Sequence, residues 1–365
     1  MIRIALVLSL SACLAPNAQG AESKEILGIW VTRWSYQTPA DIDRILDDCE
    51  RAGATHVFLQ VRGRFDAFYK SEIEPWAEEL SGTLGKDPGW DPLELAVAGA
   101  HRRGMALHPW LNTYALWSAT EAPLSVGVPH ALAAHPEWAS EDSQGARVAK
   151  GDKYLFASPG NPAVQGHIAR VVDDIDARYD VDGIHLDYLR YAGADFDHNA
   201  AALASWAGEG DRADWQREQV QVLVRDIQTR VDVPVSAAVW GVHRDTWDWG
   251  KVTEGYSDYY QDPRAMLGDG TLDAAAPMIY WSVKDPKGTR LDFAALAEEH
   301  VAHRGKGQIW TGIAAHTLSW DQIEACRGAS RAAGADGVIY FDYTSLRDKG
   351  YLDKLAEVRD QSGSR

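Results

Sequence analysis

The sequence predicts a single (β/α)₈ TIM barrel over residues 25–360, with a long insertion after the third strand. From residue 27 onward, short runs of β-branched and aromatic residues alternate with segments of helical period. This alternation is typical of a parallel sheet with crossover helices. The 365 residues suffice for one barrel with insertions. A doubly wound open sheet is the alternative, but no glycine-rich phosphate-binding motif follows the first run.

Eight strands can be counted in this pattern. They are Gly28–Arg33, His56–Arg62, Ala106–Leu111, Gly183–Tyr188, Val233–Trp240, Ala275–Trp281, Gln308–Ala314 and Gly337–Phe341. Three of the helical segments between them are each followed directly by a glycine: Pro39–Ala52 by Gly53, Pro92–Arg103 by Gly104 and Asp321–Ala333 by Gly334. Glycine readily adopts the left-handed conformation that ends many helices, so these glycines predict the helix ends.

The segment Ala115–Ser158 does not fit the regular alternation. It is rich in Pro, Ala, Ser and Gly and is too long for an ordinary connection between a strand and a helix. We expect it to fold over the end of the barrel as a lid or a wall.

Composition and charge narrow the class of protein. Hydrophobic residues make up 45% and charged residues 24% of the chain, and no run of 18 apolar residues could span a bilayer. The formal net charge of −17 argues against nucleic acid as a partner, because phosphate binding relies on Lys and Arg.

The N-terminus predicts export. Arg3 precedes the apolar run Ile4–Leu10, and residues 1–20 are typical of a signal peptide. Residues 10–13, Leu-Ser-Ala-Cys, have the form of a lipobox, so Cys13 is a candidate lipid anchor for a lipoprotein of the periplasm or outer membrane. Cleavage after Gly20 is the alternative and would leave a secreted protein that begins at Ala21.

The remaining cysteines, Cys49 and Cys326, both lie in helical segments and are expected to pack in the core. A single disulfide between them is the alternative. Two thiols cannot build the disulfide framework of a small secreted domain. The 12 His are scattered without metal-ligand spacing. We therefore expect neither a metal nor another cofactor.

Polar and aromatic residues concentrate at the ends of the expected strands, where barrel enzymes place their active sites. The candidates for substrate binding are Trp30, Gln60, Arg62, Trp110, Asn112, Tyr114, His185, Arg190, Trp240, His243, Tyr280 and Trp281. The chain has 15 Trp, and flat indole faces suit the C–H faces of sugar rings. Any single Trp could equally be core filling, but their position at strand ends favours a polysaccharide substrate.

Asp187 is the best candidate for a catalytic carboxylate. It ends the fourth expected strand, and period two places His185 and Asp187 on one face and Tyr188 on the other. A structural role in a pair with Arg190 is the alternative. Hydrolysis of a glycosidic bond needs two carboxyl groups and no cofactor.

Two other aspartates could supply the second carboxylate. Asp262 lies where the helix after the fifth strand should begin, although Asp before Pro is also an ordinary helix N-cap. Asp342 follows the eighth strand. The candidate catalytic residues are thus Asp187, Asp262 and Asp342.

At these positions the chain resembles the glycosyl-hydrolase-like family 10 of bacterial envelope proteins. The matching phrases are residues 28–32, 58–62, 108–114, 182–191, 260–262 and 276–281. The resemblance implies a TIM barrel with glycosidase activity on envelope or exported glycans, with peptidoglycan strands as the leading candidate. It marks Asp187 as the carboxylate of the fourth strand, with Asp262, Gln60, Arg62, Asn112 and Tyr280 around the sugar. Many relatives have a second Asp where this chain has Tyr188, so no role can rest on an Asp-Asp pair.

Another class of function also fits the sequence. A non-catalytic, glycan-binding envelope lipoprotein would keep the aromatic cleft and need no pair of carboxylates. An esterase is disfavoured, because the chain lacks a Gly-x-Ser-x-Gly motif and metal-ligand spacing.

Overall fold

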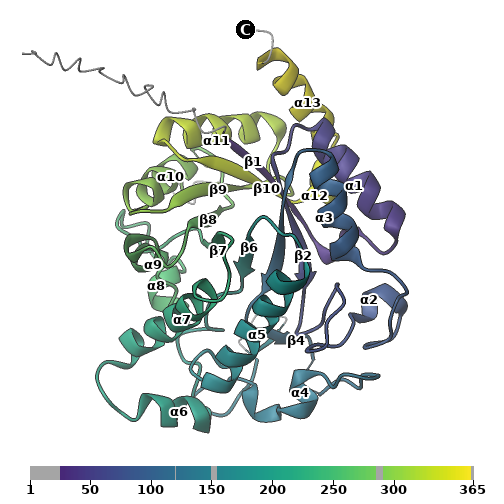
Figure 1. Ribbon diagram of the computed structural model, residues 1–365. Helices are drawn as coiled ribbons and strands as arrows, with labels where there is room; N and C mark the ends of the chain where they lie inside the picture. Colours follow the sequence, from purple (N-terminus) through teal and green to yellow (C-terminus); the bar gives the residue numbers. More distant parts are fainter. Residues whose placement is uncertain (1–24, 120, 149–153, 285–290, 363–365) are drawn as a thin grey trace, which may run out of the picture.

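Eight parallel strands close into a barrel that is surrounded by helices in the computed structural model (Figure 1). The structure describes residues 25–119, 121–148, 154–284 and 291–362, so the expected export signal and Cys13 lie outside the described residues. Around the barrel the strands follow the order β1 (Ile26–Val31), β10 (Gly337–Phe341), β9 (Gln308–Ala314), β8 (Ala274–Ile279), β7 (Val235–Trp240), β6 (Ile184–Asp187), β3 (Ala106–Asn112) and β2 (His56–Arg62). The predicted fold class is confirmed.

Five of the barrel strands differ from the predicted bounds by one or two residues at one or both ends. The second, seventh and eighth barrel strands, β2, β9 and β10, have the predicted bounds. The first strand ends at Val31, because residues 33–35 form the short 3₁₀ helix η1 (Arg33–Ser35). The fourth ends at Asp187, because Tyr188 has a φ of 49° and leaves the extended conformation.

Local capping explains where the predicted helices begin and end. Thr38 and Asp41 form a capping box at the start of α1 (Pro39–Arg51), Asp91 caps α3 (Pro92–Arg102), and Ser319 caps α11 (Trp320–Ala333). The three following glycines have φ values of 78°, 70° and 82° at Gly53, Gly104 and Gly334. The prediction that these glycines end helices is therefore confirmed.

The other helices complete the ring around the barrel and cover its ends. They are α2 (Glu78–Ser81), α4 (Ala131–Ala134), α5 (Pro162–Arg178), α6 (Ala200–Trp206), α7 (Arg212–Gln228), α8 (Gly255–Asp258), α9 (Pro263–Asp269), α10 (Phe293–Ala302), α12 (Tyr343–Asp348) and α13 (Tyr351–Ser362), with the 3₁₀ helix η2 (Pro136–Trp138). Figure 1 shows α4 and α6 at the end of the molecule opposite to α13. Among the described residues, no helix combines the length and the apolar character that a membrane span needs.

After β3 the chain leaves the barrel before it returns through α5. β4 (Ala115–Trp117) pairs antiparallel with β5 (Leu155–Phe156), and α4 and η2 lie between them in sequence. Because β4 follows the carboxyl end of β3, this two-stranded sheet stands at the end of the barrel where catalytic residues are usually found.

The barrel interior is filled with aromatic side chains. Trp30, Phe58, Trp110 and Trp310 pack with alanines and Ile339 in one buried cluster. Gly312 makes room for this packing, since a Cβ there would lie 3.0 Å from Cη2 of Trp30. Part of the high tryptophan content is therefore core filling, as for Trp310. Cys49 and Cys326 are buried free thiols, so no disulfide joins them.

Candidate active site

A cleft of about 360 Å³ opens at the carboxyl ends of the barrel strands. Its lining combines four indole rings and other aromatic side chains with a few polar groups: Trp30, Thr32, Arg33, Trp34, Gln60, Trp110, Asn112, Tyr154, Asp187, Tyr188, Arg190, Ala238, Trp240, Met278, Tyr280 and Phe341. A mainly apolar cleft with few, converging polar groups is the usual form of a small-molecule or sugar site. Of the predicted residues, the structure brings Trp30, Gln60, Trp110, Asn112, Asp187, Arg190, Trp240 and Tyr280 together here.

Asp187 is the acidic side chain in the lining of this cleft. Burial raises the pKa of its carboxyl to about 6, although the charge of Arg190 and a hydrogen bond from the backbone N–H of Tyr188 act in the opposite direction. That hydrogen bond, to Oδ1, is 2.6 Å long. The carboxyl therefore keeps its proton to a higher pH than an exposed aspartate does.

The indole of Trp110 lies beside this carboxyl. It also lowers the pKa of Asp187, although its N–H makes no hydrogen bond of normal geometry with any described residue. Trp110 is only 4% exposed. A buried N–H is costly without an acceptor, and the carboxyl of Asp187 beside it can serve as one.

Tyr280 lines the cleft and is affected by the charges of two aspartates. Desolvation raises the pKa of the Tyr280 hydroxyl well above its ordinary value, and the charges of Asp187 and Asp342 raise it further. Asp342 caps α12, and its Oδ1 accepts a hydrogen bond of 3.1 Å from the backbone N–H of Ser345. Asp342 is not part of the cleft lining itself, although its charge, like that of Asp187, raises the pKa of Tyr280.

Asp262 lies outside the cleft. Its Oδ1 accepts a hydrogen bond of 3.3 Å from the backbone N–H of Ala265, which makes it the N-cap of α9. Nε2 of His243 lies 3.9 Å from the same oxygen. His243 is itself buried behind the cleft, with its ring edge-on to Tyr256. The geometry gives Asp262 a capping role, and it gives neither residue a contact with a ligand in the cleft.

Gln60 and Asn112 form one wall of the cleft as a hydrogen-bonded pair. Gln60 Nε2 donates to Asn112 Oδ1 over 3.0 Å, and Gln60 Oε1 accepts from the backbone N–H of Arg33 over 3.1 Å. Asn112 Nδ2 in turn donates to the carbonyl of Gly63 over 3.0 Å. Most of the hydrogen-bond donors and acceptors of these two amides are used inside the protein. The pair therefore holds this wall of the cleft in place and leaves few hydrogen-bonding groups for a ligand.

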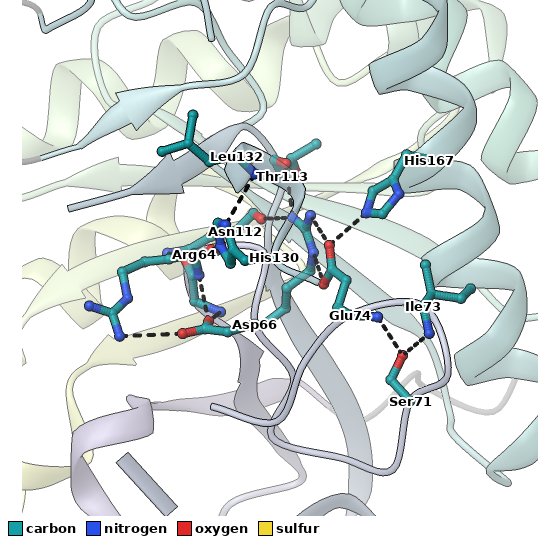
Figure 2. Close-up of polar contacts among 12 residues, drawn as sticks. Arg64, Asp66, Ser71, Ile73, Glu74, Asn112, Thr113, His130, Leu132 and His167 are labelled. Carbon is teal, nitrogen blue, oxygen red and sulfur yellow. Dashed lines mark hydrogen bonds and ion pairs between the residues drawn. The ribbon is translucent and has the colours of Figure 1, made fainter. Parts of the chain in front are cut away.

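Arg62 is buried in an ion cluster and does not line the cleft. Figure 2 shows the residues around it, among them Glu74, Thr113 and His167. Its guanidinium donates to both carboxylate oxygens of Glu74, over 2.8 and 2.7 Å, and to the carbonyls of Asn112 and Thr113. Glu74 also pairs with Nε2 of His167 at 2.9 Å. Burial alone would raise the pKa of Glu74, but Arg62 and His167 lower it to about 2. The cluster ties the segment after β2 to β3 and α5.

His185 points into the barrel core below the cleft. Its Nε2 accepts a hydrogen bond of 2.9 Å from the indole N–H of Trp30, and its Nδ1 lies 2.9 Å from Oγ of Ser236. Because Nε2 accepts, Nδ1 must carry the proton of a neutral ring. Burial lowers the pKa of His185 to about 3. This histidine therefore orients Trp30 and does not itself reach the cleft.

Two further candidates lie apart from the cleft. Tyr114 is fully buried, and its hydroxyl has no hydrogen-bond partner among the described residues. Trp281 lines a separate hollow that it shares with Trp240. Within the described ranges, no group of three or more His, Cys, Asp or Glu side chains could hold a metal ion.

Comparison with known proteins identifies the family. The family model described as glycosyl hydrolase-like 10 matches residues 25–324. The chain belongs to this family. Glycosyl hydrolase YngK of Bacillus subtilis is 28% identical over 313 residues, which are 77% of this chain and 59% of YngK. Glycosyl hydrolase DigH of Escherichia coli K12 is 31% identical over 297 residues, which are 78% of this chain and 67% of DigH. The chain thus spans about three fifths to two thirds of these relatives.

Solved structures agree with the barrel fold. The glycoside hydrolase domain of PgaB (BpsB) from Bordetella bronchiseptica superposes with a TM-score of 0.62 at 13% identity, covering 91% of this chain and 98% of that domain. The catalytic domain of β-amylase from Paenibacillus polymyxa superposes with a TM-score of 0.58 at 11% identity, covering 88% and 93%. At such identities the likeness concerns the fold.

This member of the glycosyl hydrolase-like 10 family also has cleft residues that sequence reasoning missed. Tyr188 was expected on the outer face of its strand, and this was wrong: its φ of 49° interrupts the alternation and its side chain lines the cleft. Tyr154, from the segment after β3, lines the cleft as well, and its hydroxyl accepts a hydrogen bond of 3.2 Å from Arg33. Periodicity carries no signal for either. The Asp that many relatives have at position 188 was the only hint.

Proposed function

We propose that the protein is a glycoside hydrolase that cuts an envelope or exported polysaccharide, with the glycan strands of peptidoglycan as the leading candidate. One observation carries the proposal: a buried carboxyl with a pKa of about 6 lies in an aromatic cleft at the catalytic end of a barrel. A carboxyl with a raised pKa is what a glycosidase needs in order to protonate the leaving oxygen. Membership of the glycosyl hydrolase-like 10 family supports the same reaction class.

In this proposal Asp187 is the general acid and Asp342 is the second carboxylate. Both Asp342 and Asp262 cap helices, and Asp342 is favoured because it directly follows Phe341, which lines the cleft, and because its charge raises the pKa of the cleft residue Tyr280. Asp342 would act as the base or nucleophile, and Asp187 as the acid. Such a pair needs no cofactor.

The sugar would lie against the indole faces of Trp30, Trp110 and Trp240, with polar groups aimed at its hydroxyls. Arg190 is one of these groups. Its guanidinium carbon lies 4.3 Å from the centre of the Tyr259 ring and 5.1 Å from that of Tyr188. Stacking on aromatic rings holds a guanidinium in a defined orientation.

The decisive experiment is to incubate the purified protein with intact peptidoglycan, peptide-stripped peptidoglycan and other envelope polysaccharides, and to identify the newly released sugar ends. Release of new reducing ends from one of them is the expected result. Binding to a glycan without any release of ends would contradict hydrolysis. It would instead favour the non-catalytic, glycan-binding alternative.

The pH profile tests the role of Asp187. A general acid must be protonated at the start of the reaction, so kcat/KM is expected to fall as the pH rises above about 6. Because the charge of Arg190 lowers the pKa of Asp187, an Arg190→Gln variant should move this alkaline limb to higher pH. A rate that instead falls as the pH drops below 6 would assign Asp187 as base or nucleophile.

The cellular location is a separate proposal that rests on residues 1–20. We expect the mature protein to begin at an acylated Cys13 and to fractionate with membranes, and Cys13→Ala to release it. Mass spectrometry of the mature N-terminus checks this. A first residue of Ala21 would mean plain export, to the periplasm or the medium, without a lipid anchor.

A further inference from the structure

A second hollow lies next to the cleft, and Trp240 lines both. Its volume is about 250 Å³, and it is lined by Trp240, Trp281, Lys251, Thr253 and three aliphatic side chains. Trp240 also lines the cleft. The two spaces are therefore neighbours that share Trp240 in their linings.

Two hydrogen bonds and one ring contact hold Trp240 in place. Its indole N–H donates to the carbonyl of Thr253 over 2.8 Å, and its backbone N–H donates to Oε1 of Gln261 over 2.7 Å. The ring packs against Tyr259 at a centroid distance of 4.8 Å. Since its polar edge is already satisfied, the apolar surface of the ring is what Trp240 offers to a ligand.

The chemistry of the hollow suits a sugar ring. Trp240 and Trp281 supply aromatic surface, and the aliphatic side chains add apolar area for C–H groups. Lys251 is exposed, and no hydrogen bond or ion pair joins its amine to another described residue. A purely apolar ligand would leave the amine unused, whereas a sugar hydroxyl can accept from it.

We propose that this hollow is a further sugar-binding site, which holds another ring of the same polysaccharide chain whose scissile bond lies beside Asp187. The inference rests on the proposed function and adds to it a substrate requirement. Chains long enough to reach past Trp240 gain contacts that shorter ones lack. Binding energy from such a remote ring can be used at the reacting bond, so it raises kcat/KM for long chains.

The test compares short and long peptide-free peptidoglycan oligosaccharides as substrates. For the wild-type protein, kcat/KM should rise by about tenfold or more once the chain can reach the hollow. Trp281→Ala removes one wall, and Val252→Trp fills the hollow without removing any aromatic surface. Both variants should reduce the ratio of long-chain to short-chain kcat/KM toward one.

Trp206→Ala is the matched control, because Trp206 lines neither the cleft nor this hollow; its indole N–H donates to the carbonyl of Glu209, and its ring lies near the guanidinium of Arg212. It should keep the wild-type ratio. An equal loss on short and long chains in both hollow variants, or a wild-type rate that does not depend on length, would overturn the inference. If no oligosaccharide is cut at all, the proposed function fails. The hollow is then tested by the same length ratio in dissociation constants.

Discussion

Replacing Asp187 by asparagine is expected to lower turnover by about 10²–10⁴ while glycan binding survives. Asparagine keeps the shape of the side chain but can neither donate a proton as an acid nor carry a negative charge. The cleft residues around it, such as Trp110 and Arg190, are unchanged, so the substrate should still bind. Initial rates and dissociation constants measured on the same glycan separate the two effects.

The same variant should be more stable than the wild type at neutral pH. Burial raises the folded-state pKa of Asp187 from 3.8 to about 6. Ionising it in the folded protein therefore costs free energy, and stability falls as the pH rises from about 4 to 6. An amide escapes this cost, so unfolding at pH 8 should need about 3 kcal/mol more. Urea denaturation at pH 8 and pH 4 measures the difference, which should disappear at the lower pH.

Asp342→Asn and Asp262→Asn are the matched comparisons. The first should lose activity to a similar degree if Asp342 is the second carboxylate. The second should change both activity and stability little, since asparagine caps helices about as well as aspartate does. A full rate in Asp187→Asn would remove the central proposal, and a large loss in Asp262→Asn alone would return the second role to that residue.

Replacing Glu74 by glutamine is expected to destabilise the fold by about 3 kcal/mol, because it leaves the buried guanidinium of Arg62 without a counter-charge. Both side chains of this ion pair are almost fully buried. The folded-state pKa of Glu74 lies at about 2, below the ordinary value of 4.5. The pair therefore contributes its full stability above pH 4.5 and loses it as the pH falls toward 2.

Urea denaturation at pH 7 and at pH 3 checks both the size and the pH dependence of this effect. Glu72→Gln is the control on the same segment, since Glu72 is 81% exposed and lies 3.8 Å from Arg178. An exposed pair of this kind contributes little. Equal stabilities of the Glu74 and Glu72 variants at pH 7 would show that the buried cluster does not hold this part of the protein together.

Local sequence was enough to predict the barrel and the end of it at which the candidate site lies. The signals used for this depend on neighbours only a few residues away in the sequence. They are the period-two pattern of the strands, Pro and Thr at helix starts, and glycines such as Gly53 at helix ends. Asp187, Trp30 and Trp240 could be assigned to the mouth because the carboxyl ends of parallel strands meet there. The family resemblance pointed to the same positions.

Which side chains face the cleft was decided only by tertiary structure. Arg62 ends a strand as Asp187 does, yet its guanidinium is paired with the carboxylate of Glu74. Glu74 also pairs with His167 of α5, which lies 93 positions further along the chain. His185 shares a strand face with Asp187, but both of its ring nitrogens are hydrogen-bonded inside the barrel, to Trp30 and Ser236.

The sequence by itself thus determined the fold, the end of the barrel that carries the cleft, and Asp187 as the leading carboxylate. The tertiary structure decided that Tyr188 and Tyr154 enter the cleft and that Asp262 and Asp342 each cap a helix. The physical reason is that secondary structure depends on local backbone preferences. The solvation, charge and orientation of a side chain depend instead on partners that are distant in sequence.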